Sequence, residues 1–265
     1  MVYMGSKRKY CKDIVPIIQK YIDEHNITVF IDCFCGGANL ADKIKCKSVI
    51  ANDLSPSLIA LHQQVQYEKI AFNKSSIPET SDKAWWDAAY ADWKKMKKEM
   101  DSGIDINDIQ LSMPLWKIGA IEWYASFSNG GFPRGYAKPS CGRDYYNEAY
   151  RNHQKQADED NYKKINFIQG DYKTILDRYS VLKEEKILFY CDSPYKGTKP
   201  YAINPKFSFE EYYNWLRETA KTYPIFISEQ EMPEDFTVVW EKEAKRTIGK
   251  DNNFKAVEKL FLIGD

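Results

Sequence analysis

The chain alternates short apolar runs with longer segments in which apolar residues recur at helical spacing. From residue 14 isoleucines return at every third or fourth position, which predicts an amphipathic helix. Ser55 before Pro56 is typical of a helix start, and Ser208 with Glu211 forms a capping box. These signals predict helices over residues 14–22, 56–66, 82–100 and 208–222. The apolar runs predict strands over residues 28–33, 48–51, 165–169, 187–191, 224–228, 237–241 and 257–263.

Strands that alternate with helices predict an α/β fold whose sheet is mostly parallel and Rossmann-like, with helices on both faces. Ligands bind such sheets outside the carboxyl ends of the strands. Successive predicted strands end at Asp32, which precedes a Gly36-Gly37 turn, and at Asp53, Asp171 and Asp192. We therefore expect four carboxylates and a glycine turn to meet along one edge of the sheet.

Residues 126–162 differ in character from the rest of the chain. They are rich in glycine, proline, tyrosine, asparagine and basic residues and poor in aliphatic ones, which predicts a loop-rich insertion rather than a core. The chain then reads as one domain, residues 1–125 and 163–265, with residues 126–162 inserted. An aromatic stripe precedes the insertion, and core packing is its simplest explanation; it consists of Trp85, Trp86, Tyr90 and Trp93.

Composition excludes several classes of protein. Of 265 residues, 43% are hydrophobic and 29% charged, and 38 basic residues balance 38 acidic ones, so a DNA-coating role based on charge alone is excluded. No apolar run is long enough for a membrane span, and the basic N-terminus lacks a secretory signal, so we expect a cytoplasmic protein. Six scattered cysteines indicate reduced thiols. His25, His62 and His153 form no constellation in the sequence, and no metal site is expected.

The first strand ends suit a nucleoside. A phosphate loop would place Lys-Ser or Lys-Thr after Gly36-Gly37, and a dinucleotide site would need G-x-G-x-x-G; neither is present. The carboxylate of Asp53 can accept hydrogen bonds from both hydroxyls of a ribose. S-adenosylmethionine combines such a ribose with a cationic sulfonium that acidic strand ends tolerate, and it is the expected cofactor.

Asp192-Ser193-Pro194-Tyr195 is the most informative tetrapeptide. The exocyclic amino nitrogen of a base is a poor nucleophile because its lone pair is delocalised into the ring. A carboxylate and a backbone carbonyl can accept both of its N–H groups, the proline fixes the turn, and the tyrosine offers a ring for stacking. The tetrapeptide thus suits methylation of a base amino group.

These segments together resemble the Dam-like, alpha-class adenine-specific DNA methyltransferases, including phage-encoded members. Tyr3 to Lys7 is similar to the family's W-x-G-G-K, residues 30–37 to its cofactor loop and residues 51–54 to its A-D-I-N segment. Gly170-Asp171-Tyr172 resembles the part that meets the cofactor adenine, and residues 192–195 resemble D-P-P-Y. Ser193 in place of the first proline implies a slower enzyme, and Asp32-Cys33 in place of Glu-Pro shortens one carboxylate arm.

The resemblance implies roles for particular residues. The expected catalytic residues are Asp192, Ser193, Pro194 and Tyr195. The expected cofactor-binding residues are Tyr3, Lys7, Asp32, Phe34, Gly36, Asp53, Asp171, Tyr172 and Asp192. The inserted region lies where the family keeps its target-recognition segment, and its basic and amide side chains Asn129, Arg134, Lys138 and Arg143 are expected to contact double-stranded DNA. No histidine base is required, because the proton can leave to water after methyl transfer.

Three alternatives remain open at this point. The same tetrapeptide would serve an amino-group methyltransferase acting on RNA. Protein glutamine methylation is disfavoured because those enzymes usually carry N-P-P-Y. A catalytically silent DNA-binding protein of the same fold is supported only by Ser193. The sequence does not give a recognition site or a restriction partner, and we expect a monomer.

Overall fold

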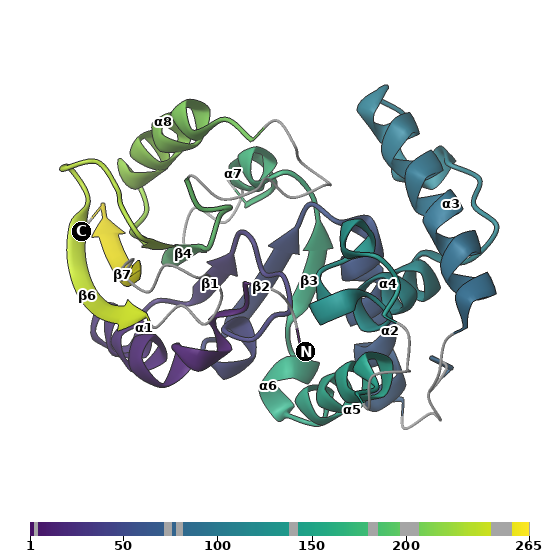
Figure 1. The fold of residues 1–265 in the computed structure, drawn as a ribbon. Helices are drawn as coiled ribbons and strands as arrows, with labels where there is room; N and C mark the ends of the chain where they lie inside the picture. The colour runs from purple at the N-terminus through teal and green to yellow at the C-terminus, as the bar shows by residue number, and fades with distance from the viewer. Residues whose placement is uncertain are drawn as a thin grey trace.

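The computed structural model describes residues 1–2, 5–71, 76–77, 82–137, 143–179, 185–196, 207–244 and 256–264 (Figure 1). Its seven strands are β1 (Val29–Asp32), β2 (Ser48–Asp53), β3 (Asn166–Gln169), β4 (Ile187–Cys191), β5 (Ile225–Glu229), β6 (Thr237–Ala244) and β7 (Ala256–Ile263). They form one sheet in the order β3-β2-β1-β4-β5-β7-β6. β1 to β5 are parallel, and β7 runs antiparallel to its neighbours β5 and β6. The predicted α/β fold is confirmed.

The central strands β1, β4 and β5 are buried on both faces of the sheet, which explains why they read as continuous apolar runs. Phe30 of β1 packs with the helices on one face, whereas Val29 and Ile31 pack with α7 (Ile175–Tyr179) and α8 (Phe209–Ala220) on the other. The first face is covered by α1 (Cys11–His25) and α2 (Pro56–Ile70). The structure extends the predicted helix 14–22 at both ends, and the left-handed Asn26 closes it.

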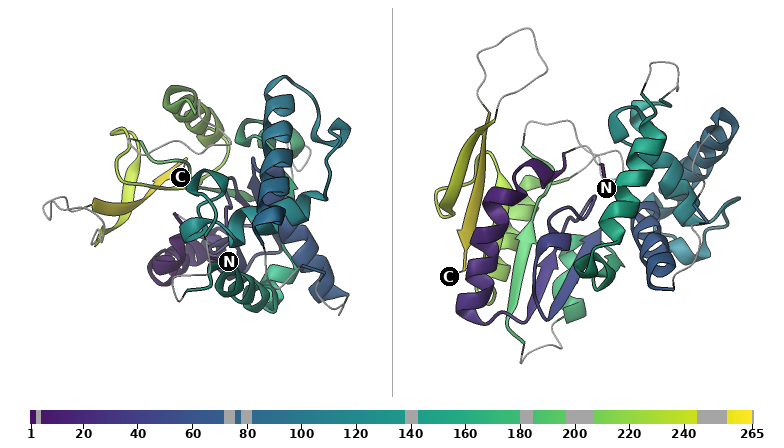
Figure 2. Two further views of the ribbon diagram at one scale, coloured as in Figure 1. Left: turned by 45° about the vertical axis from the view of Figure 1, so that its right-hand side comes forward. Right: turned by 90° about the horizontal axis from the view of Figure 1, so that it is seen from below.

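A helical unit lies between α2 and β3 in the chain. It consists of α3 (Lys83–Asp101), α4 (Leu115–Tyr124), α5 (Tyr145–Ala157) and α6 (Asp160–Lys163). Figure 2 shows α3, α4 and α5 side by side beyond the β3 edge of the sheet. The predicted insertion, residues 126–162, thus covers only the second half of this unit.

The expectation that residues 126–162 contain no core is wrong. Tyr146, His153 and Tyr162 are buried among the core residues of α2 and α4. Tyrosine and histidine count as polar when periodicity is assessed, yet the Tyr162 hydroxyl and the His153 ring nitrogen are hydrogen-bonded to each other, which makes their burial inexpensive. The aromatic stripe on α3 is core, as predicted: Trp86 and Trp93 are buried against Phe132 of the following loop.

The described helices include none whose length and apolar character would allow it to cross a bilayer.

Candidate active site

The carboxyl ends of β1, β2, β3 and β4 open into one cavity of about 1050 Å³. Asp32, Asp53, Asp171 and Asp192 all line it. This convergence follows from the topology, because β1 pairs in parallel with β2 on one side and with β4 on the other. The volume lies at the upper end of the range of about 300–1,000 Å³ typical of small-molecule sites. The cavity therefore has room for more than a single small ligand.

Asp53 is held by the turn that follows β1. Its Oδ2 accepts a hydrogen bond from the Gly36 N–H at 3.0 Å, and its Oδ1 accepts one from the Ser55 N–H at 2.9 Å. Gly36 has a positive φ of 48°, a conformation that glycine adopts without strain. Burial raises the pKa of Asp53, and these peptide donors oppose the shift. The turn and the carboxylate thus form one rigid corner of the cavity.

Asp32 and two aromatic rings form the adjoining wall. The Asp32 Oδ1 accepts a hydrogen bond from the Phe34 N–H at 3.3 Å, and burial raises the pKa of this carboxyl well above its usual range. The rings of Phe34 and Tyr172 lie 5.2 Å apart, and both line the cavity beside Asp171. This wall combines acceptors with flat apolar surface.

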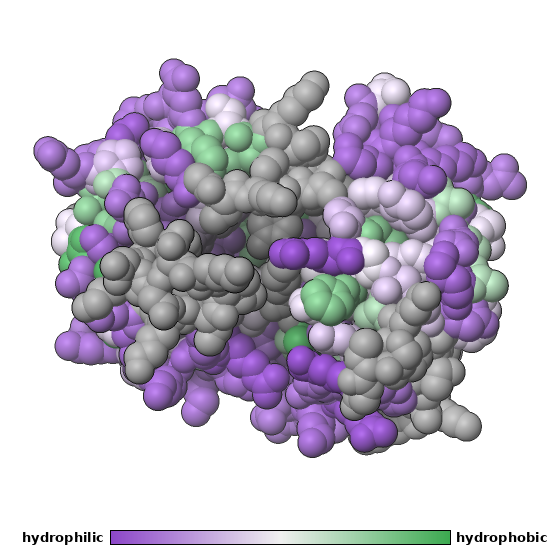
Figure 3. Space-filling view, in the orientation of Figure 1, coloured by the Kyte–Doolittle hydropathy of each residue, from purple (hydrophilic) through white to green (hydrophobic). Residues whose placement is uncertain are grey.

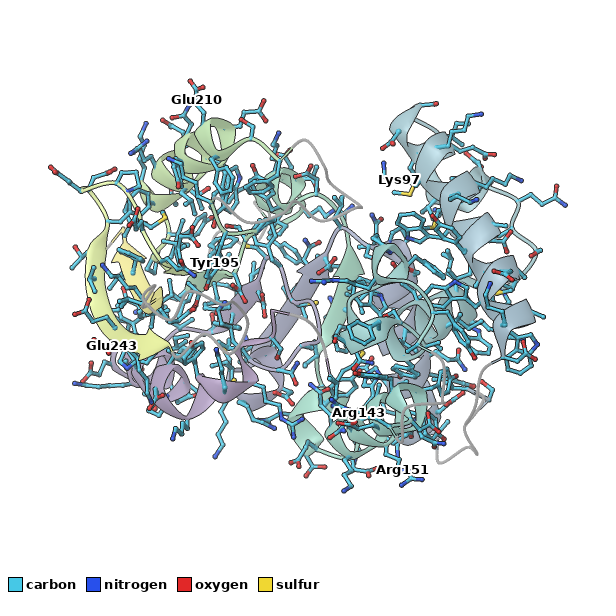
Figure 4. The ribbon with its side chains drawn as sticks, in the orientation of Figure 1. Lys97, Arg143, Arg151, Tyr195, Glu210 and Glu243 are labelled. Atoms are coloured by element: carbon cyan, nitrogen blue, oxygen red, sulfur yellow. The ribbon has the colours of Figure 1, made fainter. Side chains whose placement is uncertain are left out.

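The Lys7 side chain connects the N-terminal segment to the end of β4. Its Nζ lies 2.8 Å from Asp192 Oδ1 and 3.3 Å from Glu258 Oε1, and 4.3 Å from the centre of the Tyr195 ring. The Tyr195 hydroxyl donates a hydrogen bond to the same Glu258 oxygen. Burial raises the pKa of Asp192 to about 6, although the Lys7 ammonium opposes the shift. Asp192, Lys7, Tyr195 and Glu258 form a closed polar cluster, and Figure 4 shows Tyr195 over the middle of the sheet.

The turn after β4 is fixed from behind by Glu229 at the end of β5. Glu229 Oε1 accepts a hydrogen bond from the Lys196 N–H at 3.0 Å, and burial raises the pKa of this carboxyl to about 7. Ser193 is buried and lines the cavity together with Pro194. A serine at this position is thus accommodated without opening the turn to solvent.

The helical unit supplies the wall opposite the strand ends. Glu122 and Trp123 of α4 line the cavity together with Gly131 and Arg134 of the loop that follows α4. Ser57 donates a hydrogen bond to Glu122 Oε2 at 2.7 Å, and burial raises the pKa of Glu122 to about 8. The predicted insertion and the predicted cofactor loop therefore face one another across the same cavity.

The four residues predicted to contact DNA lie in different settings. Arg134 lines the cavity. Arg143 is exposed, paired with Glu148, and lies over the Tyr145 ring near α5 (Figure 4). Asn129 is buried, and its amide donates a hydrogen bond to the Trp123 carbonyl oxygen at 2.9 Å. Lys138 lies outside the described residues, as does Tyr3 of the predicted cofactor site.

Three buried acids around the cavity were not predicted from the sequence. Glu258 lies on the antiparallel strand β7 and Glu229 on β5 behind the turn after β4, so the strand-end rule did not select them. Glu122 did carry a signal, because it is the one charged residue in the apolar stretch 118–125.

The statement that the histidines form no constellation is wrong for two of them. His62 and His153 lie with ring centres 4.9 Å apart and are joined through the Tyr162 hydroxyl. Neither lines the cavity. Within the described residues no cluster of three or more His, Cys, Asp or Glu side chains is arranged to hold a metal ion.

Three comparisons relate the chain to known proteins. Modification methylase StsI of Streptococcus sanguinis is 34% identical over 64 residues, which are 24% of this chain and 9% of that protein. The rRNA methyltransferase aviRa from Streptomyces viridochromogenes aligns over 98% of this chain and 86% of its own at 11% identity. Its TM-score of 0.42 is too low to carry an argument.

The third comparison covers most of the chain. Residues 3–232 match the family model of the D12 class N6 adenine-specific DNA methyltransferases, a range that includes the strand-end aspartates, the tetrapeptide and the helical unit but not Glu258. The predicted family is thereby confirmed: the chain belongs to the D12 class N6 adenine-specific DNA methyltransferase family.

Proposed function

We propose that this protein transfers a methyl group from S-adenosylmethionine to the exocyclic amino nitrogen of adenine in duplex DNA. The observation that carries the proposal is the single cavity in which the Asp192 to Tyr195 turn adjoins the Asp32 and Asp53 strand ends. The chain's membership of a family of adenine-specific DNA methyltransferases supports a cavity that holds a methyl donor beside the target adenine. Methyltransferases of this kind use S-adenosylmethionine in general, whereas the roles of individual residues are our proposal.

The strand-end residues fit the cofactor. Asp53 retains acceptor capacity for the ribose hydroxyls, because the Gly36 and Ser55 N–H groups occupy only part of the lone pairs on its two oxygens. Phe34 and Tyr172 offer flat surface for the adenine ring beside Asp171, and Asp32 and Lys7 lie where the charged amino-acid part would be held. We keep Gly36 and Tyr3 as further contacts. When bound, S-adenosylmethionine supplies an electrophilic methyl group to the amino nitrogen.

The end of β4 fits the target base. We propose that Asp192 and the Ser193 carbonyl accept the two amino N–H bonds of a flipped adenine, that Pro194 fixes this turn, and that Tyr195 stacks on the ring. Lys7 holds Asp192 Oδ1, so the carboxylate is kept in place and its other oxygen is directed to the base. Stacking, worth about 1–3 kcal/mol, offsets much of the few kcal/mol that flipping costs. The amino proton then leaves to water.

We propose that the rim beside α4 and α5 contacts DNA. Arg134 and Lys9 line the cavity, and Arg143 and Arg151 lie nearby at the α5 side of the molecule (Figure 4). We propose that Arg143 and Lys138 also contact the DNA, as expected from the sequence. Because its amide is bonded to the end of α4, Asn129 would act by shaping the Arg134 loop. The proposed location is the cytoplasm of a bacterium or phage-infected cell, where such DNA is found, and a monomer suffices for the chemistry.

The alternatives are not favoured by the family. The family is specific for adenine in DNA, which weighs against an RNA substrate. The buried, paired state of Lys7, Asp192 and Glu258 does not suit a silent binder.

Incubation with labelled S-adenosylmethionine and unmethylated duplex DNA, followed by mass spectrometry of the nucleosides, tests the proposal. We expect N6-methyladenine, and we expect Asp192→Ala to abolish it while the protein still binds duplex DNA. The exposed Asp158→Ala variant serves as the matched control. Label in a parallel incubation with RNA but none with DNA, or unchanged turnover by Asp192→Ala, would overturn the proposal.

A further inference from the structure

We call Gly36 and Asp53 the cofactor corner. Four polar side chains form a continuous buried chain from this corner to the end of α4. They are His62 of α2, Tyr124 of α4, His153 of α5 and Tyr162 of α6, and none of them is exposed to solvent. The mechanism proposed above uses none of them. We call this set the His–Tyr relay.

Every hydrogen bond of the relay has one direction. The Gly36 carbonyl can only accept, so His62 Nε2–H donates to it at 2.8 Å. Burial lowers the pKa of His62 to about 3, so its Nδ1 is unprotonated and accepts from the Tyr162 hydroxyl at 2.8 Å. That hydroxyl has no second proton, and it therefore accepts from His153 Nε2–H at 2.7 Å. His153 Nδ1 accepts in turn from the Tyr124 hydroxyl at 2.6 Å.

The relay begins at the cofactor corner. Gly36, whose carbonyl oxygen is the last acceptor, donates its own N–H to Asp53. The His62 ring is also clamped, because it stacks on Phe167 of β3 at 4.7 Å. A shift of the Gly36 peptide would therefore change both the position of Asp53 and the first bond of the relay.

The relay ends at the base of the loop that carries Arg134. Tyr124 is the last residue of α4. The loop that follows is closed on itself, since the Ala137 N–H donates to the Ala125 carbonyl at 2.8 Å and the Phe127 N–H donates to that of Gly135 at 3.0 Å. Movement of Tyr124 would therefore move this loop as a unit.

Helix α5 connects the same two regions a second time. Gln156, one turn after His153, donates its side-chain amide to the carbonyls of Gly37 and Ala38 at 3.2 and 3.1 Å. At the other end of α5, Tyr145 packs on the exposed ring of Phe127 at 5.6 Å. One face of this helix thus contacts the backbone beside the cofactor corner, while its first residue contacts the loop that carries Arg134.

We infer that the His–Tyr relay couples the cofactor corner to the Arg134 loop, so that duplex DNA and cofactor each strengthen binding of the other. His62, Tyr162 and His153 are positioning residues in this account, because they touch neither ligand. In a buried, close-packed interior the members of a directional hydrogen-bonded chain have little freedom to move independently, so fixing one end restricts the other. Coupling of this kind is reciprocal between the two ligands. The inference rests on the proposed function, since it requires that both ligands bind.

The test compares binding of S-adenosylhomocysteine by calorimetry with and without a short duplex that the wild type methylates in the assay described above. For the wild type we expect the duplex to tighten binding by at least about five-fold, the lower end of usual coupling. Tyr162→Phe removes the central hydroxyl and its two hydrogen bonds but keeps the ring. Tyr124→Phe removes only the last donor, and it decides the matter if Tyr162→Phe does not fold. Tyr150→Phe makes the same change beside Tyr124 but outside the relay.

We expect the first two variants to reduce the tightening to less than about two-fold and Tyr150→Phe to preserve it. A defect that is only structural would weaken both measurements and leave their ratio unchanged. A wild-type ratio near one, relay variants with the wild-type ratio, or an equal loss in Tyr150→Phe would each overturn the inference. If the wild type methylates DNA but the duplex leaves S-adenosylhomocysteine affinity unchanged, only the coupling is wrong. If the wild type does not methylate DNA, the proposed function itself is wrong.

Discussion

At the scale of single residues, the cavity is defined by carboxyl groups that are costly to ionise. Glu122 shows this most clearly, because it lies inside an apolar helix segment and the partner of its carboxyl group within the described residues is the neutral Ser57 hydroxyl. Burial raises its pKa from 4.5 to about 8, and nearby Asp53 adds to the shift. Glu122 is therefore a neutral acid at physiological pH, in contrast to the ion-paired Asp192.

This shift predicts how stability depends on pH. Between 4.5 and about 8 the folded protein holds a proton on Glu122 that the unfolded chain has released. The stability due to Glu122 is therefore complete below 4.5, falls as pH rises and levels off above about 8. Glu122→Gln removes the effect. From about pH 5.5 to 7.5 we expect the unfolding free energy of the wild type, relative to the variant, to fall by up to about 2.7 kcal/mol.

Urea unfolding of both proteins at the two pH values checks this expectation. All other titrating groups are shared, so their contributions cancel in the difference. Parallel behaviour of the two proteins would mean that Glu122 is already ionised in the folded state.

How far such residues can be found from sequence depends on where they lie. Asp53 and Asp192 were selected because parallel strands bring their carboxyl ends together, a rule that needs no side-chain detail. Glu258 lies on an antiparallel strand and reaches Lys7 only through the pairing of β7 with β5, which the pattern of one strand cannot specify.

At the scale of elements, the site depends on a close crossing of α2 and α4. Gly119 of α4 faces the backbone of Ser57 on α2, and a Cβ atom at this position would lie 2.1 Å from the Ser57 carbonyl oxygen. Ser57 is fully buried and binds Glu122 through its hydroxyl, so the helices cannot separate without disturbing the cavity wall. The glycine is thus required by space rather than by backbone conformation.

Gly119→Ala is therefore expected to be severe. We expect a loss of at least about 3 kcal/mol of unfolding free energy, the upper end of the usual cost of overpacking. Gly103→Ala is the control, because its Cβ would meet nothing within 4 Å although its φ is 85°. Only the conformational cost of about 1–2 kcal/mol applies there. Thermal or urea unfolding measures both, and an equal loss in the two variants would contradict the steric argument.

Elements differ in how well their sequences reveal them. The strands and the capped helices α2 and α8 follow from apolar runs and from Ser55 and Ser208, whose hydroxyls cap the helices as expected. The sequence does not reveal helix α5 in this way. The residues it buries include Tyr146 and His153, and their burial depends on partners from α4 and α6. A polar residue that is buried by pairing gives no periodic signal until its partner is known.

At the scale of the whole molecule, charge is balanced overall and divided locally. The 38 basic and 38 acidic residues cancel, and hydrophilic residues predominate in the coloured part of the face shown in Figure 3. The strand ends place Asp32, Asp53 and Asp192 in the cavity, and the Lys7 ammonium is paired with Asp192, so this wall offers a DNA backbone carboxyl groups rather than cations. Attraction must therefore come from cations at the rim, of which Arg134 and Lys9 line the cavity directly.

Salt should accordingly separate the two ligands. Binding of duplex DNA releases counterions in proportion to the phosphates contacted, so we expect its Kd to rise at least about ten-fold between 50 and 200 mM salt, as two phosphate contacts require. Binding of S-adenosylhomocysteine in the acidic cavity involves no such release and should change less than about two-fold. Arg134→Ala should lower the slope of log Kd against log salt by about 0.9, the share of one phosphate.

Lys97→Ala is the matched control for this slope, because it also removes one positive charge. Lys97 lies on α3, where it forms an ion pair with Asp101 at 2.6 Å. Figure 4 shows it near the far end of that helix, away from Tyr195. Fluorescence anisotropy with a labelled duplex gives all three slopes. If the wild-type Kd is flat across the salt range, the rim does not bind phosphates. If both variants lower the slope equally, the attraction depends on net charge, and a protein with no net charge would then owe its DNA affinity to contacts inside the cavity.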